Sequence, residues 1–158
     1  MKQLVTSFAE YDLWANQKLL EVVLSLTEAQ QQQEIKSSFP SVHKTCSHLW
    51  DAYRRWWQRL HMENNIAGPV LPSDYSTREV VNEILQLNKQ WIDWINEASE
   101  TDMEAMLTYQ NTKGDTFHQP VKHILLHLFN HGTYHRGQLV TLLRQLGVEQ
   151  IPQTDYIP

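Results

Sequence analysis

The sequence lacks the features from which disulfide-linked folds and membrane-spanning helices are built, namely several cysteines and long apolar runs. Cys46 is the only cysteine among 158 residues, so the chain cannot form an internal disulfide or a zinc site built from cysteines. No stretch approaches about 18 consecutive apolar residues, which argues against a membrane-spanning helix. The N-terminal stretch also lacks the apolar run and small-residue cleavage site of a signal peptide. We therefore expect a cytoplasmic protein with no membrane partner.

Basic residues are also few and scattered. Lysine and arginine number 13 against 18 aspartates and glutamates, which gives a net charge of −5 with neutral histidines. The densest basic cluster, Arg54, Arg55 and Arg59, is diluted by Asp51. Nucleic acid is therefore not an expected partner, because a phosphate-tracking surface needs a longer basic block. The length fits one domain, which we place at residues 1–158.

Glycine and proline are scarce, at five and six residues, and they cluster between long periodic segments. Apolar residues recur every three or four positions in these segments, as in amphipathic helices. We expect four helices, at residues 2–26, 41–62, from 76 onward, and 120–146. Ser41 and Ser76 are predicted N-caps, and Gly147 is the predicted stop of the last helix. Together these features predict an all-α fold, a four-helix bundle.

The helical pattern breaks at residues 106–118. Threonine and tyrosine there flank Lys113-Gly114-Asp115, which suits a turn. A short hairpin before the last helix and an irregular loop fit this segment equally well. We expect the loops at 63–75 and 104–119 to form the walls of any substrate pocket.

Four of the eight histidines, His123, His127, His131 and His135, are spaced four residues apart on the last predicted helix. Each residue of a helix advances about 100° around the axis. Relative to the centre of the apolar stripe, His135 lies at roughly 30° and His131 at roughly 70°. His127 and His123 lie at roughly 110° and roughly 150°. The first pair therefore points inward, and the second faces solvent or a flank.

Two imidazoles on the buried side of a helix need polar partners. A metal ion is one solution, since histidines four residues apart can bind the same ion, and hydrogen bonds to protein groups are the other. A third histidine from the second helix would favour the metal. His43 and His48 both lie there, and periodicity does not choose between them, although the small residues beside His48 leave more room. His61 and His118 lie near element ends and are expected to be solvated.

The segment HLFNHGTYHRGQLVTLLRQLG, residues 127–147, resembles the hallmark of the DinB/YfiT-like superfamily of metalloenzymes. Residues 11–16, 41–57 and 155–156 are similar to that superfamily as well, so the resemblance touches nearly the whole chain. It implies a four-helix bundle that binds one divalent metal ion through three histidines: His48, His131 and His135. We expect the ion to be zinc or nickel, although imidazole also suits copper and iron. Homodimers are common in the superfamily, so we also expect a homodimer.

Superfamily members of known activity are bacterial thiol transferases, and a related enzyme isomerises maleylpyruvate. Three imidazoles leave an open coordination position, which is the pattern of a catalytic site. The resemblance therefore implies an enzyme of the thiol S-transferase type, with a small-molecule substrate and a low-molecular-weight thiol. The alternatives are a metal-dependent hydrolase, a non-catalytic metal-binding or sensor protein, and a structural bundle whose histidines are satisfied by hydrogen bonds.

Several other side chains are candidates to support such a site. Asn130, Gln138 and Asp12 could hydrogen-bond the imidazoles, although Asp12 fits a surface or helix-cap position better. Arg136 lies off the inward stripe and fits a structural ion pair better than a substrate clamp. Three aromatic residues could line the pocket, with core packing at least as good an explanation for the two tryptophans: Trp14, Trp56 and Tyr156.

Overall fold

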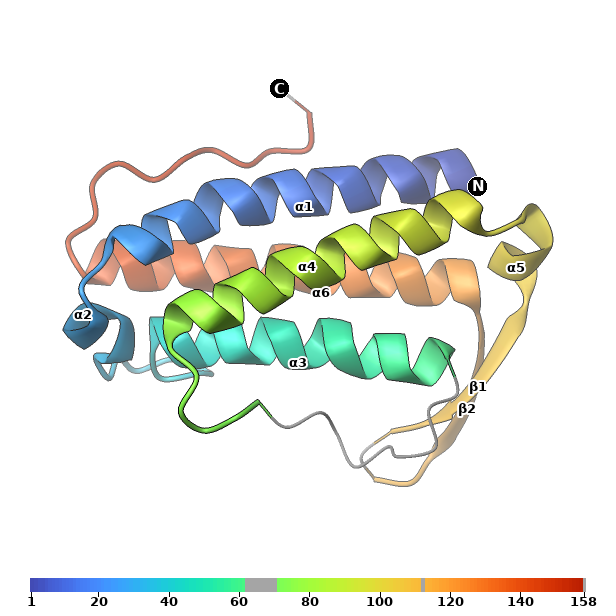
Figure 1. Cartoon of the computed structure of the whole chain (residues 1–158), viewed down its shortest axis with the longest axis horizontal. Coiled ribbons are helices and arrows are strands. Elements are labelled where there is room, and N and C mark those ends of the chain that lie inside the picture. Colours follow the sequence, from blue (N-terminus) through green and yellow to red (C-terminus); the bar gives the residue numbers. More distant parts are fainter. Residues whose placement is uncertain (62–70, 112, 158) are drawn as a thin grey trace.

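The computed structural model describes residues 1–61, 71–111 and 113–157. Its elements, in chain order, are α1 (Lys2–Ser25), α2 (Glu28–Gln32), α3 (Val42–Leu60), α4 (Thr77–Glu97), α5 (Glu100–Glu104), β1 (Met106–Gln110), β2 (Thr116–Pro120) and α6 (Val121–Gln145). The four long helices pack together, and the hairpin lies at one end of the bundle (Figure 1). The predicted four-helix bundle is therefore confirmed, and the segment before the last helix forms a hairpin rather than an irregular loop. Most of the loop predicted at 63–75 lies outside the described residues.

Local signals in the sequence set the helix ends. The Ser41 hydroxyl accepts a hydrogen bond from the first turn of α3, as an N-cap does. Ser76 and Glu79 form a reciprocal capping box at the start of α4. Gly147, at φ +84°, follows the end of α6 in a left-handed conformation that favours glycine. Pro120 caps α6 rather than beginning it, because it is still paired as the last residue of β2.

Each long helix packs against two of the others. α1 and α3 lie at opposite corners of the bundle, as do α4 and α6, so α3 contacts both α4 and α6. α3 and α4 run in one direction, and α1 and α6 run in the other (Figure 1). α3 and α6 are therefore antiparallel neighbours. This arrangement brings residues of the second and the last predicted helix face to face.

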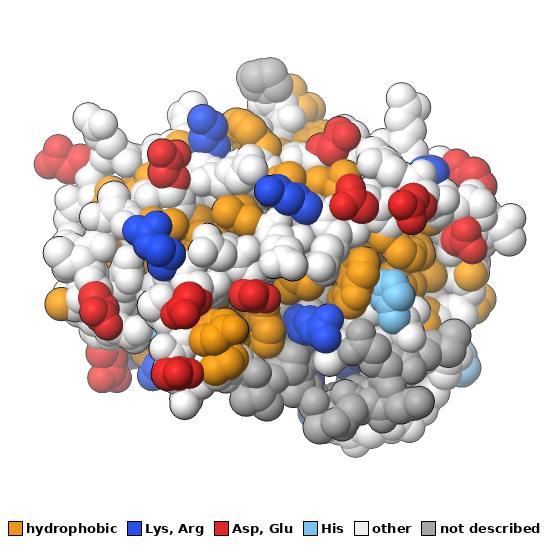
Figure 2. Space-filling model, viewed as in Figure 1, with side chains coloured by type: hydrophobic (Ala, Val, Ile, Leu, Met, Phe, Trp, Pro, Cys, Tyr) orange, Lys and Arg blue, Asp and Glu red, His pale blue; other side chains and the backbone are white. Residues whose placement is uncertain are grey.

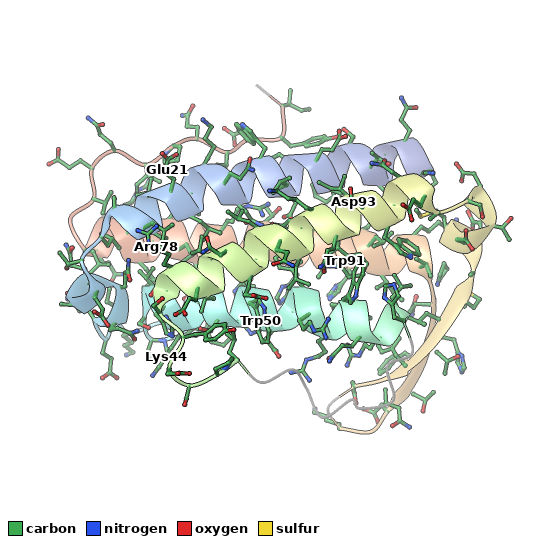
Figure 3. All side chains as sticks on the ribbon, in the orientation of Figure 1. Glu21, Lys44, Trp50, Arg78, Trp91 and Asp93 are labelled. Carbon is green, nitrogen blue, oxygen red and sulfur yellow. The ribbon has the colours of Figure 1, made fainter. Side chains whose placement is uncertain are left out.

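The core lies between the four long helices. Trp91 of α4 is fully buried there, and its ring meets that of Trp57 from α3 edge to face, with centroids 5.1 Å apart. Exposed charged residues such as Glu21, Arg78 and Asp93 lie on the outer sides of α1 and α4 (Figure 3). Acidic and basic side chains are both scattered over this face, and neither sign forms a continuous patch (Figure 2). None of the helices in the described part of the chain is both long and apolar enough to cross a membrane.

The hairpin leads directly into α6 and packs against α3. β1 and β2 pair antiparallel, and Gly114 lies in the connection between them at φ +87°, where glycine has no steric penalty. Tyr109 of β1 packs against Trp56 of α3, with ring centroids 4.9 Å apart and planes at 74°. The hairpin therefore covers the groove between α3 and the start of α6.

Candidate metal centre

Three imidazoles meet in the interface between α3 and α6. His48 lies on α3, and His131 and His135 lie one turn apart on α6. Their Nε2 atoms form a triangle with sides of 3.0 Å (His131 to His135), 3.1 Å (His48 to His135) and 3.3 Å (His48 to His131). Among the described residues, no other group of three or more histidine, cysteine or acidic side chains is spaced for a metal ion. The structure thus brings His48 to the inward pair and leaves His43 outside.

The spacing of this triangle suits a divalent metal ion. Zinc binds imidazole nitrogen at about 2.0–2.1 Å. That bond length separates two ligand nitrogens by about 3.3 Å at the tetrahedral angle and by about 2.9 Å at a right angle. The observed separations of 3.0–3.3 Å lie between these values. No fourth protein ligand joins the group within the described residues, so part of the coordination sphere of such an ion would stay open.

His135 determines how the triangle can be protonated. Its Nδ1 lies 2.8 Å from Oε1 of Gln138, so Nδ1 carries the proton and Nε2 presents a lone pair to the centre. If both other rings carried Nε2–H groups, those groups would face each other across 3.3 Å. If only one of these two rings, or neither, carried an Nε2–H group, the lone pairs of two Nε2 atoms would face each other along another side of the triangle. No arrangement of neutral imidazoles satisfies all three contacts, whereas a cation between them does.

The environment keeps these imidazoles neutral. Burial, together with the neighbouring imidazoles, lowers the pKa of both His48 and His131 to about 4. Burial also lowers the pKa of His135, against a smaller rise caused by the Gln138 hydrogen bond. Neutral imidazole is the form that binds metal ions. The centre therefore consists of three uncharged nitrogen donors at neutral pH.

Aromatic rings pack against the imidazoles from two sides. Phe39, in the connection before α3, stacks on His48 with ring centroids 4.0 Å apart and planes at 18°. The same ring lies 5.7 Å from His135, edge to face. Tyr134 of α6 meets His135 edge to face at 5.0 Å. Together with the Gln138 hydrogen bond, these contacts hold the rings in place by packing as well as by polar interactions.

A second polar cluster lies buried beside the imidazoles, and its centre is Asp12 of α1. The carboxylate accepts a hydrogen bond from one residue of each other long helix: Tyr53 of α3, Asn88 of α4 and Arg136 of α6. Asn16 completes the cluster by donating to Tyr53 and Asn88 and accepting from Arg136. All five side chains are buried. The cluster therefore ties the four long helices together at one level of the bundle. Burial raises the pKa of Asp12, and the Arg136 guanidinium opposes that rise.

Gly132 lies where this cluster passes α6, directly after His131. A Cβ atom at Gly132 would lie 2.6 Å from Tyr53 Oη and 2.7 Å from Asp12 Oδ1. Those distances are shorter than any ordinary contact between nonbonded atoms, so glycine is needed for α6 to approach its neighbours this closely. The polar cluster thus fixes the turn of α6 that carries the two histidines.

Two predictions about this cluster were wrong. Asp12 is not a surface or helix-cap residue, because it is fully buried at the centre of the cluster. Arg136 does not lie off the inward side, since only 3% of it is exposed, but it does form the predicted structural ion pair, with Asp12. The helical wheel failed here because it counted apolar residues only. Gly132 and Arg136 form a second buried strip of α6, beside the apolar one.

Of the other side chains predicted to support the site, only Gln138 makes a hydrogen bond or ring contact with one of the three imidazoles, within the part of the chain that the structure describes. Gln138 makes the predicted contact with His135, whereas Asn130 is exposed. Tyr156 packs against aromatic residues of α1, and so does Trp14, which places both away from the triangle. Trp56 contacts the ring of His127, one turn of α6 before the triangle.

The other five histidines lie outside the triangle. Four of them are exposed: His61, His118, His123 and His127. His43 is half-buried, and its Nδ1 lies 3.0 Å from the hydroxyl of Thr77 on α4. Its Nδ1 therefore has a hydroxyl partner, whereas the Nε2 atoms of the three converging rings face one another.

Sequence reasoning missed Phe39 and the role of Gly132. Phe39 lies outside any helix, so periodicity carries no signal for it. Gly132 did carry a signal in the sequence. A glycine inside a helix lowers helix stability by about 1 kcal/mol relative to alanine, so its presence indicates a packing reason. The buried partners of Asp12 carried no such signal, because polar residues at helical spacing are equally consistent with surface positions.

Comparisons with known proteins agree with this architecture. The model of the DinB family matches residues 1–157. The protein DinB of Bacillus subtilis (strain 168) is 29% identical over 154 residues, covering 93% of this chain and 88% of its own length. A DinB-like protein from Bacillus cereus ATCC 10987 has a similar structure, with a TM-score of 0.68, 23% identity and 91% of each chain covered. So does YfiT from Bacillus subtilis, described as a probable metal-dependent hydrolase with an unusual four-helix bundle topology, with a TM-score of 0.65, 14% identity, and 93% and 90% covered.

Proposed function

This chain belongs to the DinB family, and we propose that it is a metal-dependent enzyme whose one divalent ion is held by His48, His131 and His135. We propose further that it transfers a low-molecular-weight thiol to a small-molecule electrophile. Zinc and nickel are the proposed ions, because both accept imidazole ligands in this number.

One observation carries the proposal, namely the triangle of Nε2 atoms 3.0–3.3 Å apart with the lone pair of His135 directed into it. Hydrogen bonds among neutral imidazoles leave at least one side of the triangle repulsive. A purely structural role for these histidines is therefore disfavoured. The neighbouring Asp12 cluster shows the contrast, since each of its polar side chains has hydrogen-bond partners within the protein.

When bound, a divalent ion held by three neutral imidazoles supplies an open position that lowers the pKa of a thiol or a water molecule. The protein's own contribution is to hold the imidazoles. Gln138 fixes His135 in the tautomer whose Nε2 is free, and Phe39 keeps water from the outer face of His48.

Thiol transfer is favoured over hydrolysis by the lower pKa of the nucleophile. A free thiol has a pKa of about 8.5, against about 15.7 for water, so a thiol needs less help from a protein base. No carboxylate is a fourth ligand of the triangle among the described residues, so the open position stays available to a thiol.

Hydrolysis is the second candidate, and one comparison favours it. YfiT, which shares this fold, is described as a probable metal-dependent hydrolase. The same open position could serve water instead of a thiol. The homodimer and the cytoplasmic location stay predictions for this chain.

Metal content tests the first step of the proposal. Chelator-treated protein that is reconstituted with zinc or nickel should hold about one ion per chain. The variants His48→Ala and His131→Ala should lose most of it, whereas His43→Ala, changed on the same helix as His48, should keep it. A wild-type protein that retains less than roughly 0.1 ion per chain would refute the metal site.

Activity measurements separate the two reactions. Metal-loaded protein is incubated with a thiol and monochlorobimane, and separately with an activated ester. Thiol transfer predicts a thiol-dependent rise in fluorescence that His131→Ala lacks. Ester cleavage without any thiol, also lost in His131→Ala, would favour the hydrolase. Fully loaded protein that shows neither rate above the His131→Ala control would overturn the enzymatic proposal in favour of a binding or sensor role.

A further inference from the structure

A pocket of about 190 Å³ lies beside the metal centre, between α3, α6 and the hairpin. Its lining residues come from all three: Trp56, Tyr109, Gln119, His123, Ile124 and His127. His127 lies one turn before His131 on α6, and the centroids of the two rings are 6.1 Å apart. The pocket therefore adjoins the triangle through His127, and a molecule seated in it can extend along α6 toward the three imidazoles.

The walls of this pocket are held in place by an arginine outside it. The guanidinium of Arg59 lies 4.6 Å from the ring centroid of Trp56 and 5.1 Å from that of Tyr109. It also donates a hydrogen bond to the backbone carbonyl of Gln110 at 2.9 Å. These contacts clamp the hairpin onto α3, so the two aromatic walls keep their edge-to-face angle of 74°. The pocket is thus formed before any ligand arrives.

The lining favours a flat ring with an anionic substituent. Trp56, Tyr109 and Ile124 supply aromatic and apolar walls, on which a planar group can pack. His123 and His127 offer ring N–H groups, and no carboxylate is among the lining residues that the structure describes. The volume is below the roughly 300 Å³ at which typical small-molecule pockets begin. It therefore suits one ring with a substituent rather than a whole cofactor.

We propose that this pocket binds an aromatic acid, with its ring packed against the corner that Trp56 and Tyr109 form and its carboxylate toward His123 and His127. The role of that acid as the substrate rests on the proposed metal-dependent reaction, while the binding itself does not. In that reaction the pocket would select electrophiles that carry such a ring, and His127 would border the path from the ring to the metal centre.

Binding of 4-chlorobenzoate to the full chain tests the proposal, by calorimetry on metal-loaded and on metal-free protein. Trp56→Leu should weaken binding about tenfold, because it removes one ring wall. Trp14→Leu is the matched control, since Trp14 is exposed on α1 outside the pocket. His123→Leu should weaken the binding of 4-chlorobenzoate more than the binding of the neutral 4-chlorobenzamide. His118→Leu, which changes an exposed histidine outside the lining, should affect neither.

The outcomes separate this inference from the proposed function. If Trp56→Leu keeps one ion per chain and still loses affinity, the pocket is supported independently of the metal. If wild type binds 4-chlorobenzoate through Trp56 but holds no metal, the pocket is supported and the proposed function fails. If wild type does not bind the acid, or Trp56→Leu binds it as well as Trp14→Leu does, the inference is wrong. Equal losses of acid and amide in His123→Leu would overturn the anionic part of it.

Discussion

Gly132→Ala should destabilise the protein, although alanine is the better helix former. The new Cβ would lie 2.6 Å from Tyr53 Oη and 2.7 Å from Asp12 Oδ1, and both side chains are buried and hydrogen-bonded. Overpacking of this kind costs about 1–3 kcal/mol, and a buried hydrogen bond that breaks costs about 1–3 kcal/mol more. Alanine returns about 1 kcal/mol through helix propensity. We expect a net loss of about 1–5 kcal/mol in the free energy of unfolding.

Gly137→Ala is the matched control for this change. Gly137 lies on the same helix, is exposed, and has open space where a Cβ would be added. This variant should gain up to about 1 kcal/mol, because only helix propensity acts. Urea denaturation of both metal-free variants, followed by circular dichroism, measures the difference. A Gly132→Ala protein as stable as Gly137→Ala would refute the claim that close approach of α6 to Asp12 and Tyr53 requires glycine.

Three further results should follow from the same contacts. Gln138→Leu should reduce metal affinity about 10–100-fold in a chelator competition, with little change in the urea midpoint, because it removes the partner of His135 Nδ1. Arg136→Met should cost about 3–5 kcal/mol in urea denaturation by leaving the Asp12 carboxylate buried and unpaired, and an Asp12→Leu change added to it should restore part of that loss. The metal-free protein should lose stability as the pH falls from about 6.5 toward about 4, because the unfolded chain takes up protons on His48 and His131 that the folded chain, with pKa values of about 4, does not. Replacing both histidines with leucine should flatten that pH dependence of the urea midpoint, and an unchanged slope would contradict it.

Much of the fold could be predicted because its signals are local. The capping box at Ser76 and the positive φ at Gly147 are set by a few neighbouring residues, so the sequence carries them directly. The inward direction of His131 and His135 likewise depends on one helix alone. The hairpin could not be separated from a loop, because its stability comes from Tyr109 packing on Trp56, a contact across more than fifty positions of chain.

The parts that sequence reasoning could not supply depend on two helices at once. The buried residues of α3 form one stripe that includes neither His43 nor His48, so helical periodicity does not single out His48. That choice is made by the antiparallel packing of α3 on α6, which places His48 beside His135 and leaves His43 against Thr77 of α4. The Asp12 cluster is harder still to predict from the sequence, because it joins four helices and each of its members, taken alone, is consistent with an ordinary surface position.

The Asp12 cluster and the imidazole triangle, two polar clusters inside the bundle, have different roles. The Asp12 cluster satisfies itself, since its carboxylate accepts three hydrogen bonds and its guanidinium has two side-chain acceptors within the cluster. Such a closed cluster can fix which helices pack together without binding anything else. In the imidazole triangle, by contrast, no placement of protons on neutral rings satisfies all three Nε2 contacts, which is the condition under which an ion is the better partner. Gly132 joins the two, because the residue that admits the Asp12 cluster directly follows the ligand His131. Changes that loosen the closed cluster should therefore reduce metal affinity as well as stability, whereas changes confined to the triangle, such as Gln138→Leu, should reduce metal affinity alone.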